Sequence, residues 1–251
     1  MFNKVVPVKS LALACLSFSV SISAIAKETT PIQEHLVKPF IAEYSIIHKS
    51  DPVGKAFREL KYLDNNQVEY SYKTDISWLI FSDNRHEIST VELSDSTVTP
   101  VNYKFTREGT GRDKKYAWEF DVKNNKATNL EKNKTLDVDF PPNIQDKLSY
   151  HLQHRLSLIE NPKQQHFVYP VISTSGKIKN YVYQYDGEEE IMLPYGLVKT
   201  VRLKREVTEK KRVTYVWFAP ELNYLLVKLY QVKGGVEQFE AQLVSVEDTG
   251  N

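Results

Sequence analysis

The sequence predicts a mainly β protein, a curved antiparallel sheet that forms an open or closed β-barrel with one packed α-helix. Three observations support this fold class. Apolar and polar residues alternate along most of the chain, turn-forming residues separate these stretches, and one segment repeats its apolar residues every four positions instead. We expect a single domain over residues 27–251, because a chain of about this length buries roughly 70% of its unfolded surface.

Residues 1–26 have the features of a secretory signal peptide. Lys4 and Lys9 accompany an apolar run from Leu11 to Ile25, and Ala24-Ile25-Ala26 supplies the small residues that signal peptidase requires. We therefore predict export to the bacterial periplasm, with cleavage near Ala26. A lipoprotein signal at Cys15 is an alternative, although the apolar stretch before this cysteine is short. Removal of residues 1–26 would leave the mature chain without a cysteine for a disulfide or a thiolate site.

Alternation with a period of two marks the first strands. The apolar stripes are Phe40, Ala42, Tyr44 and Ile46; Val68, Tyr70 and Tyr72; Val101, Tyr103 and Phe105; and Tyr116, Trp118 and Phe120. Polar residues such as Lys73, Lys104 and Glu119 alternate with them. Successive side chains of a strand face opposite sides of the sheet, so one face is predicted to be buried and the other exposed to water.

Turn-forming residues separate these stripes. They are Asp64-Asn65-Asn66, Asp83-Asn84, residues 108–111, Asn124-Asn125 and Gly234-Gly235. Such residues favour tight reversals, which predicts hairpins and about a dozen mostly antiparallel strands. A sheet of this size with one apolar face twists and curls, which also protects its edges.

One segment predicts a helix. Between Asn143 and Ile159 the apolar residues Ile144, Leu148, Leu152 and Leu156 recur every four positions, and Pro141-Pro142 precede them. This amphipathic helix needs an apolar surface to cover, and the apolar face of the sheet is the large one available.

The stretch VWFAPELNYLLV, residues 216–227, predicts a hairpin corner. Pro220 cannot donate a hydrogen bond to a neighbouring strand, so the chain turns between Ala219 and Leu222 and a new strand begins at Tyr224. Pro194-Tyr195-Gly196 predicts a second corner of this kind.

Four segments together resemble a bacterial family, the domain of unknown function 3108 (DUF3108). They are residues 217–224 (WFAPELNY), 190–196 (EIMLPYG), 146–149 (DKLS) and 40–44 (FIAEY), and the resemblance covers most of the mature chain. It implies a secreted protein without assigned activity, similar in fold to the periplasmic lipoprotein-carrier and lipid-binding barrels. Leu226 stands where the family pattern has proline.

Metal and catalytic sites have weak signals. His151 and His154 share a side of the predicted helix, but no third ligand accompanies them, so we expect a solvated helix face and no metal site. Glu188-Glu189-Glu190 reads as a solvated turn. No nucleophile elbow, zinc-protease motif or phosphate-binding glycine loop is present, so we expect no enzyme, no catalytic residues and no cofactor.

Aromatic residues are abundant, at 12% of the chain. We expect most of them to fill the core and the rest to line a ligand cavity, because a large barrel holds either side chains or a guest. The ligand-lining candidates are Trp78, Phe81, Tyr103, Phe105, Trp118, Phe120, Tyr183, Trp217 and Tyr224.

The stretch from Ser77 to Phe81 is apolar on both faces. We favour a strand covered by a second layer, and the alternative is an exposed patch for a lipid or a partner.

The expected partners follow from charge and hydropathy. With 33 basic and 32 acidic residues the chain lacks the positive charge typical of nucleic-acid binding. After residue 26 no apolar run reaches the roughly 18 residues of a transmembrane helix. An outer-membrane barrel is disfavoured because the polar sides of the strands carry lysines and arginines.

We therefore expect a periplasmic, non-catalytic binding module for a lipid or other apolar or amphiphilic molecule. A structural or protein-interaction component of the cell envelope with a solid core is the alternative, and a hydrolase with an unrecognised site comes third.

Overall fold

The computed structural model describes residue 1, residues 36–63 and residues 67–250. The predicted signal peptide and the predicted turn Asp64-Asn65-Asn66 lie outside the described residues, apart from residue 1. Within the described residues, the helices and strands lie between Phe40 and Asp248.

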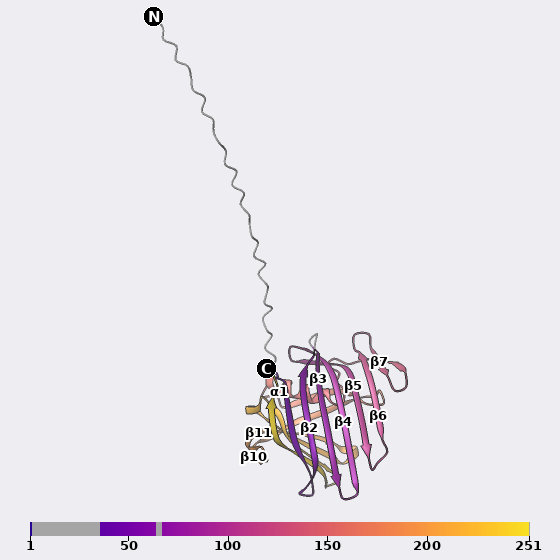
Figure 1. The fold of residues 1–251 in the computed structure, drawn as a ribbon, viewed down its shortest axis with the longest axis vertical. Helices are drawn as coiled ribbons and strands as arrows, with labels where there is room; N and C mark the ends of the chain where they lie inside the picture. The colour runs from indigo at the N-terminus through magenta and orange to yellow at the C-terminus, as the bar shows by residue number, and fades with distance from the viewer. Residues whose placement is uncertain (2–35, 64–66, 251) are drawn as a thin grey trace. The chain divides into compact units, whose positions relative to one another are not determined.

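Fourteen strands form one antiparallel sheet in the order β8-β7-β6-β5-β4-β3-β2-β1-β14-β13-β12-β11-β10-β9. The strands are β1 (Phe40–His48), β2 (Asp51–Tyr62), β3 (Gln67–Trp78), β4 (Phe81–Ser94), β5 (Thr97–Gly109), β6 (Lys114–Asp121), β7 (Lys126–Asn129), β8 (Lys134–Asp137), β9 (His166–Ile172), β10 (Ile178–Leu193), β11 (Gly196–Val207), β12 (Arg212–Ala219), β13 (Leu225–Lys233) and β14 (Val236–Asp248). The sheet bends so that its two halves face each other, and it stays open because β8 and β9 do not pair (Figure 1). The predicted curved antiparallel sheet is thus confirmed.

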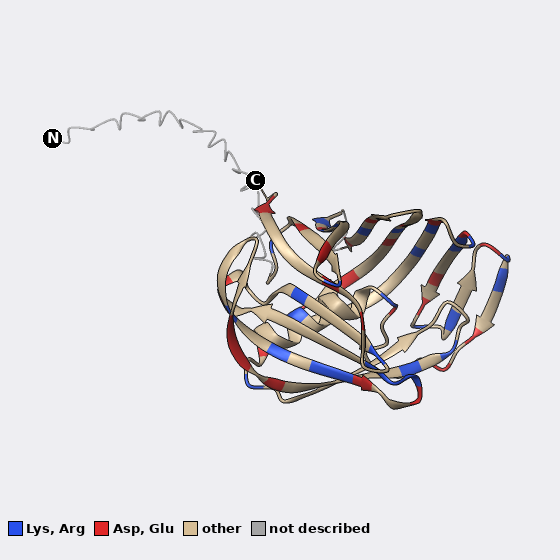
Figure 2. Cartoon of the chain, turned by 90° about the horizontal axis from the view of Figure 1, so that it is seen from below, with Lys and Arg blue, Asp and Glu red and all other residues tan. Residues whose placement is uncertain are grey.

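Alternating burial follows the predicted stripes. In β3, Val68, Tyr70 and Thr74 are buried, whereas Lys73 and Asp75 are exposed. Figure 2 shows charged residues spread along the strands. The concave face of the sheet therefore carries the core.

Most predicted turns are confirmed, but the turn at Asp83-Asn84 is wrong. These two residues lie inside β4, and the reversal takes place at Leu79 and Ile80, where Leu79 has a positive φ of 54°. The expectation of a covered strand at residues 77–81 is wrong for the same reason. Leu79 and Ile80 form a hairpin tip and are 82% and 84% exposed.

The corner after β12 is confirmed. A short 3-10 helix, η2 (Pro220–Leu222), follows Ala219, and the backbone N–H of Tyr224 donates to the carbonyl of Ala219 at 2.8 Å. β13 begins at Leu225, one residue later than predicted. The other corner, at Pro194 and Tyr195, is also confirmed. The glutamates at 188–190 lie within β10 and do not form a turn.

The helix α1 (Ser149–Glu160) is shorter than the predicted segment from Asn143 to Ile159. Gln145 instead forms a parallel bridge with Val171 of β9. The carboxylate of Asp146 accepts the backbone N–H groups of Leu148 and Ser149, each at 2.7 Å, and so caps the start of the helix. The backbone of Gln145 donates to the carbonyl of Pro170 and accepts from the N–H of Ile172, each at 2.8 Å, so the chain is extended before Asp146 and the helix begins only after it.

α1 packs against both halves of the sheet. Leu148, Leu152 and Leu156 belong to the larger core cluster, whereas Tyr150 and Leu158 belong to a second cluster with residues of β9 to β13. The amide of Gln153 exchanges hydrogen bonds with the backbone of Ser96 and Val98 beside the β4–β5 turn. The helix therefore ties the two halves together near this end of the sheet.

Candidate functional site

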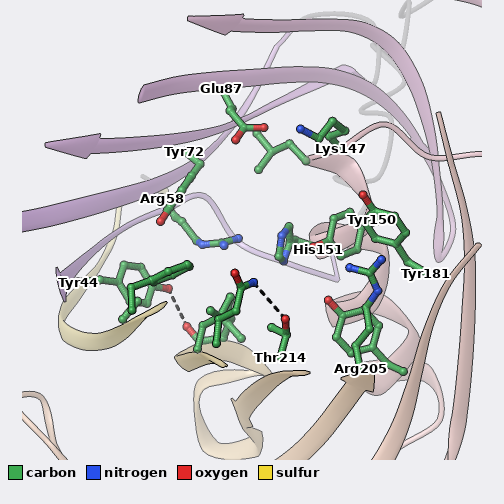
Figure 3. A pocket seen from close by; sticks show the side chains of 17 residues that line it. Tyr44, Arg58, Tyr72, Glu87, Lys147, Tyr150, His151, Tyr181, Arg205 and Thr214 are labelled. Atoms are coloured by element: carbon green, nitrogen blue, oxygen red, sulfur yellow. Dashed lines mark hydrogen bonds between the residues drawn. The ribbon is translucent and has the colours of Figure 1, made fainter. Parts of the chain in front are cut away.

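An inner cavity of about 220 Å³ lies on the concave face, beside the start of α1. Strands from both halves of the sheet and residues 147–151 contribute its lining, and the side chains in Figure 3 point toward a common space. The helix reaches this space because it is held to both β5 and β9.

Three basic side chains line the inner cavity: Arg58 of β2, Lys147 before α1 and Arg205 of β11. Arg58 is 5% exposed and donates to the hydroxyl of Tyr70 at 2.8 Å. Its guanidinium lies 4.8 Å from the ring centroid of Tyr72. Both partners are neutral, so the charge of Arg58 is held by a hydrogen bond and a cation–π contact.

The other two basic groups also lie against aromatic rings. The guanidinium of Arg205 is 3.5 Å from the ring centroid of Tyr181, and the Lys147 ammonium is 5.8 Å from that of Phe105. In the part of the chain that the structure describes, the ion pairs are formed by other basic residues. The cavity therefore contains positive charge that no carboxylate within ion-pair distance neutralises.

Among the described residues that line the inner cavity, Glu87 of β4 is the one carboxylate. Its Oε2 accepts a hydrogen bond from the hydroxyl of Tyr103 at 2.7 Å. Glu87 of β4 pairs directly with Phe105 of β5, and Tyr103 lies two residues before Phe105 on that strand. One acidic group against three basic groups leaves the site positive.

Tyrosines form much of the remaining wall. The hydroxyl of Tyr44 donates to the carbonyl of Leu226 at 2.7 Å, which joins β1 to β13. Burial, reinforced by Tyr183 and Tyr181 nearby, raises the pKa of Tyr150 well above its ordinary value. Burial also raises the pKa of Tyr44 and of Tyr183. These phenols stay protonated and add no charge to the cavity.

The two helix histidines lie in different surroundings, and the expected solvated face is wrong for both. His151 lines the inner cavity, where burial and then the charge of Arg58, with His154 and Arg205, lowers its pKa well below 6.5. His154 is 1% exposed, and its ring centroid lies 4.8 to 5.1 Å from those of Phe167, Tyr169, Tyr183 and Phe218. Burial lowers the pKa of His154 to about 3. Both imidazoles are neutral at neutral pH.

An outer cavity of about 350 Å³ adjoins the inner one. Both are lined by Tyr72, Glu87 and Phe239. The outer walls are mainly apolar and include Ile46, Val53, Ile76, Trp78 and Phe81, whereas the guanidinium of Arg85, which also lines this cavity, is paired with Asp83 at 2.8 Å. Along β3, Tyr72, Thr74, Ile76 and Trp78 lead from the inner cavity to the hairpin tip at Leu79 and Ile80. The concave face thus becomes mainly apolar toward this tip.

Three of the nine predicted aromatic candidates line a cavity: Tyr183 the inner one, and Trp78 and Phe81 the outer one. Phe105 packs beside Tyr116, and Trp118 stacks on Phe120. Tyr103 donates a hydrogen bond to Glu87. The indole of Trp217 donates to Glu189 at 2.8 Å, and Tyr224 packs against the second core cluster.

The basic residues of the inner cavity were not predicted, although the sequence contains a signal for two of them. Arg58 follows Ala56 and precedes Leu60 with a period of two, and Arg205 follows Val201 and Leu203 in the same way. A cation at the inward position of an apolar stripe is costly unless it is paired or functional. Within the described residues no group of three or more histidine, cysteine, aspartate or glutamate side chains could hold a metal ion.

Comparisons with known proteins agree with this fold. Residues 67–240 match the family described as protein of unknown function (DUF3108). No curated protein matches the chain. A beta-barrel-like protein of domain of unknown function DUF1849 from Brucella abortus is 9% identical, with a TM-score of 0.56, and the match covers 84% of this chain and 98% of that chain.

Another solved structure, described as "a putative lipoprotein" from Parabacteroides distasonis ATCC 8503, is 10% identical with a TM-score of 0.35, and the match covers 84% and 96% of the two chains. The likeness to the Brucella abortus protein, at 9% identity, concerns the fold alone. The described residues contain no helix with the length and hydrophobicity needed to cross a membrane.

Proposed function

Because this chain belongs to the DUF3108 family of proteins of unknown function, we propose its role from its cavities: it is an exported, non-catalytic binding protein of the periplasm. It holds an amphiphilic molecule, such as a lipid or a single acyl chain, in the two adjoining cavities. One observation carries this proposal. Among the described residues, a cavity with three unpaired basic groups and a mainly apolar cavity share Tyr72, Glu87 and Phe239, so one molecule with a polar and an apolar end fits both.

The hydroxyl groups of the cavity walls support a role without covalent chemistry. Thr214 accepts a hydrogen bond from Gln231, and Thr74 has no partner within the described residues. Neither is paired with a histidine, as an activated hydroxyl nucleophile would be. His86 and Glu190 are exposed and lie apart from the cavity that His151 lines.

The test is native purification followed by mass spectrometry of bound small molecules. Ala241 is buried and lines the inner cavity, so Ala241→Phe fills the space without adding charge. Lys73→Phe adds the same ring on the exposed face of β3 and is the matched control. We expect the wild type and the control to retain an amphiphile and the Ala241 variant to lose it. Equal recovery from a folded Ala241 variant, or nothing bound and no binding of added amphiphiles, would refute the proposal.

A second candidate is an interaction component of the cell envelope. It is favoured by the hairpin tip, where Trp78 and Phe81 are 36% and 54% exposed beside Leu79 and Ile80. Replacement of Leu79 and Ile80 with serine would then abolish capture of the envelope partner and leave amphiphile binding unchanged.

A further inference from the structure

We infer that the amphiphile has an anionic head group, a carboxylate or a phosphate, which binds between Arg58, Lys147 and Arg205, while its single acyl chain runs through the outer cavity toward Trp78. This inference rests on the proposed function and adds the chemical class and the orientation of the ligand.

Uncompensated charge is the first argument. Arg58 is almost fully buried, and its partners are a phenol and an aromatic face. A buried charge is costly unless it is paired, and guanidinium groups bind carboxylate and phosphate in a bidentate way. An anion between the basic groups would provide the counter-charge that Glu87 supplies only in part.

The surroundings of His151 agree with this positive potential. His151 lies on the inner cavity with Arg58, Lys147, Arg205 and Glu87, and burial, with the nearby positive charge as a second cause, favours its neutral form. A bound anion would counter that effect and raise the pKa of His151. The same imidazole would then donate a hydrogen bond to the head group.

The arrangement of the walls sets the orientation. Arg58, Lys147 and Arg205 all line the inner cavity. Arg85, the one arginine or lysine among the described residues that line the outer cavity, already has Asp83 as its counter-charge. The outer cavity offers Ile46, Val53 and Ile76, on which an acyl chain gains about 0.8 kcal/mol per buried methylene. A cationic head group would be repelled in the inner cavity, and an uncharged one would leave the basic groups unpaired.

Four probes with the same chain separate these cases: hexadecanoate, hexadecyl phosphate, hexadecanol and hexadecyltrimethylammonium, each titrated into the purified chain below its micelle concentration. We expect the two anions to bind at least about tenfold more tightly than the alcohol, which corresponds to one charge-assisted interaction. The ammonium compound should bind more weakly than the alcohol. Whichever of hexadecanoate and hexadecyl phosphate binds more tightly shows whether the natural head group is a carboxylate or a phosphate.

Lys147→Met and Arg58→Gln should each weaken anion binding about tenfold and leave hexadecanol binding unchanged. Lys147 is only partly buried, so its variant tests the inference even where the Arg58 variant fails to fold. Lys104→Met, on the exposed face of β5, is the matched control and should bind as the wild type does.

Equal binding of all four probes would overturn the inference and leave the proposed function intact. Anion binding that survives Lys147→Met and Arg58→Gln unchanged would also overturn it. No binding of any probe would overturn the proposed function itself.

Discussion

Replacement of His154 with phenylalanine tests how α1 is anchored above the cavity. The imidazole is enclosed by four aromatic rings, and its Nε2 has no hydrogen-bond partner within the described residues. Burial lowers the pKa of His154 from 6.5 to about 3. The unfolded chain therefore binds a proton in this range that the folded chain does not, and stability falls as the pH drops below about 6.5.

The magnitude follows from the two pKa values. With 6.5 for the unfolded and about 3 for the folded chain, the penalty grows by about 2 kcal/mol between pH 7 and pH 5. Phenylalanine has no such proton, so His154→Phe should gain about 2 kcal/mol relative to the wild type over this interval.

The assay is urea unfolding followed by tryptophan fluorescence, with wild type and variant compared at pH 7, 6 and 5. His151 titrates in the same direction in both proteins, so the difference between them isolates His154. The four rings could instead stabilise an imidazolium through cation–π contacts. A difference in unfolding free energy that stays constant from pH 7 to pH 5 would show this and would contradict a lowered pKa for His154.

Three further predictions concern the helix start, a close contact in the sheet and the ligand. Burial raises the pKa of Asp146 from 3.8 to about 6, so the contribution of Asp146 to stability is greatest below pH 3.8 and is lost as the pH rises through 6. Asp146→Asn keeps an acceptor for both backbone N–H groups. Its unfolding free energy should therefore gain about 2 kcal/mol on that of the wild type between pH 4 and pH 7 in the same unfolding assay. Gly54→Ala should cost about 2 kcal/mol or more, because a Cβ there would lie 2.1 Å from the carbonyl oxygen of Asp75, and an unchanged melting temperature would contradict this. An anionic amphiphile should raise the pKa of His151, which NMR titration of its ring protons in the presence and absence of hexadecanoate would measure.

The sequence predicts the sheet well because alternation encodes which face of a strand is buried. It misplaces the β3–β4 turn because Asp83 and Asn84 are typical turn residues, whereas Leu79 and Ile80 are not. The carboxylate of Asp83 instead pairs with Arg85 on the same strand and with Arg107 on the neighbouring β5, and the second contact is one that no local pattern reveals.

The helix shows a similar limit. The repeat of Leu148, Leu152 and Leu156 identifies one buried face, but the sheet wraps around α1 and buries His154 on another. The cavity needs side chains from strands far apart in the sequence, such as Arg58 and Arg205, and their convergence depends on curvature. The sequence therefore predicts the curved sheet around one helix, but not the basic residues on its concave face.

The most direct test of the account is paramagnetic NMR with stearic acid that carries a nitroxide label either near the carboxylate or near the chain end. We predict that the label near the carboxylate broadens the signals of Arg58 and His151, and that the label at the chain end broadens those of Ile76 and Trp78. Broadening confined to the exposed tip at Leu79 and Ile80, or absent from both cavities, would contradict the claim that an amphiphile lies within the sheet.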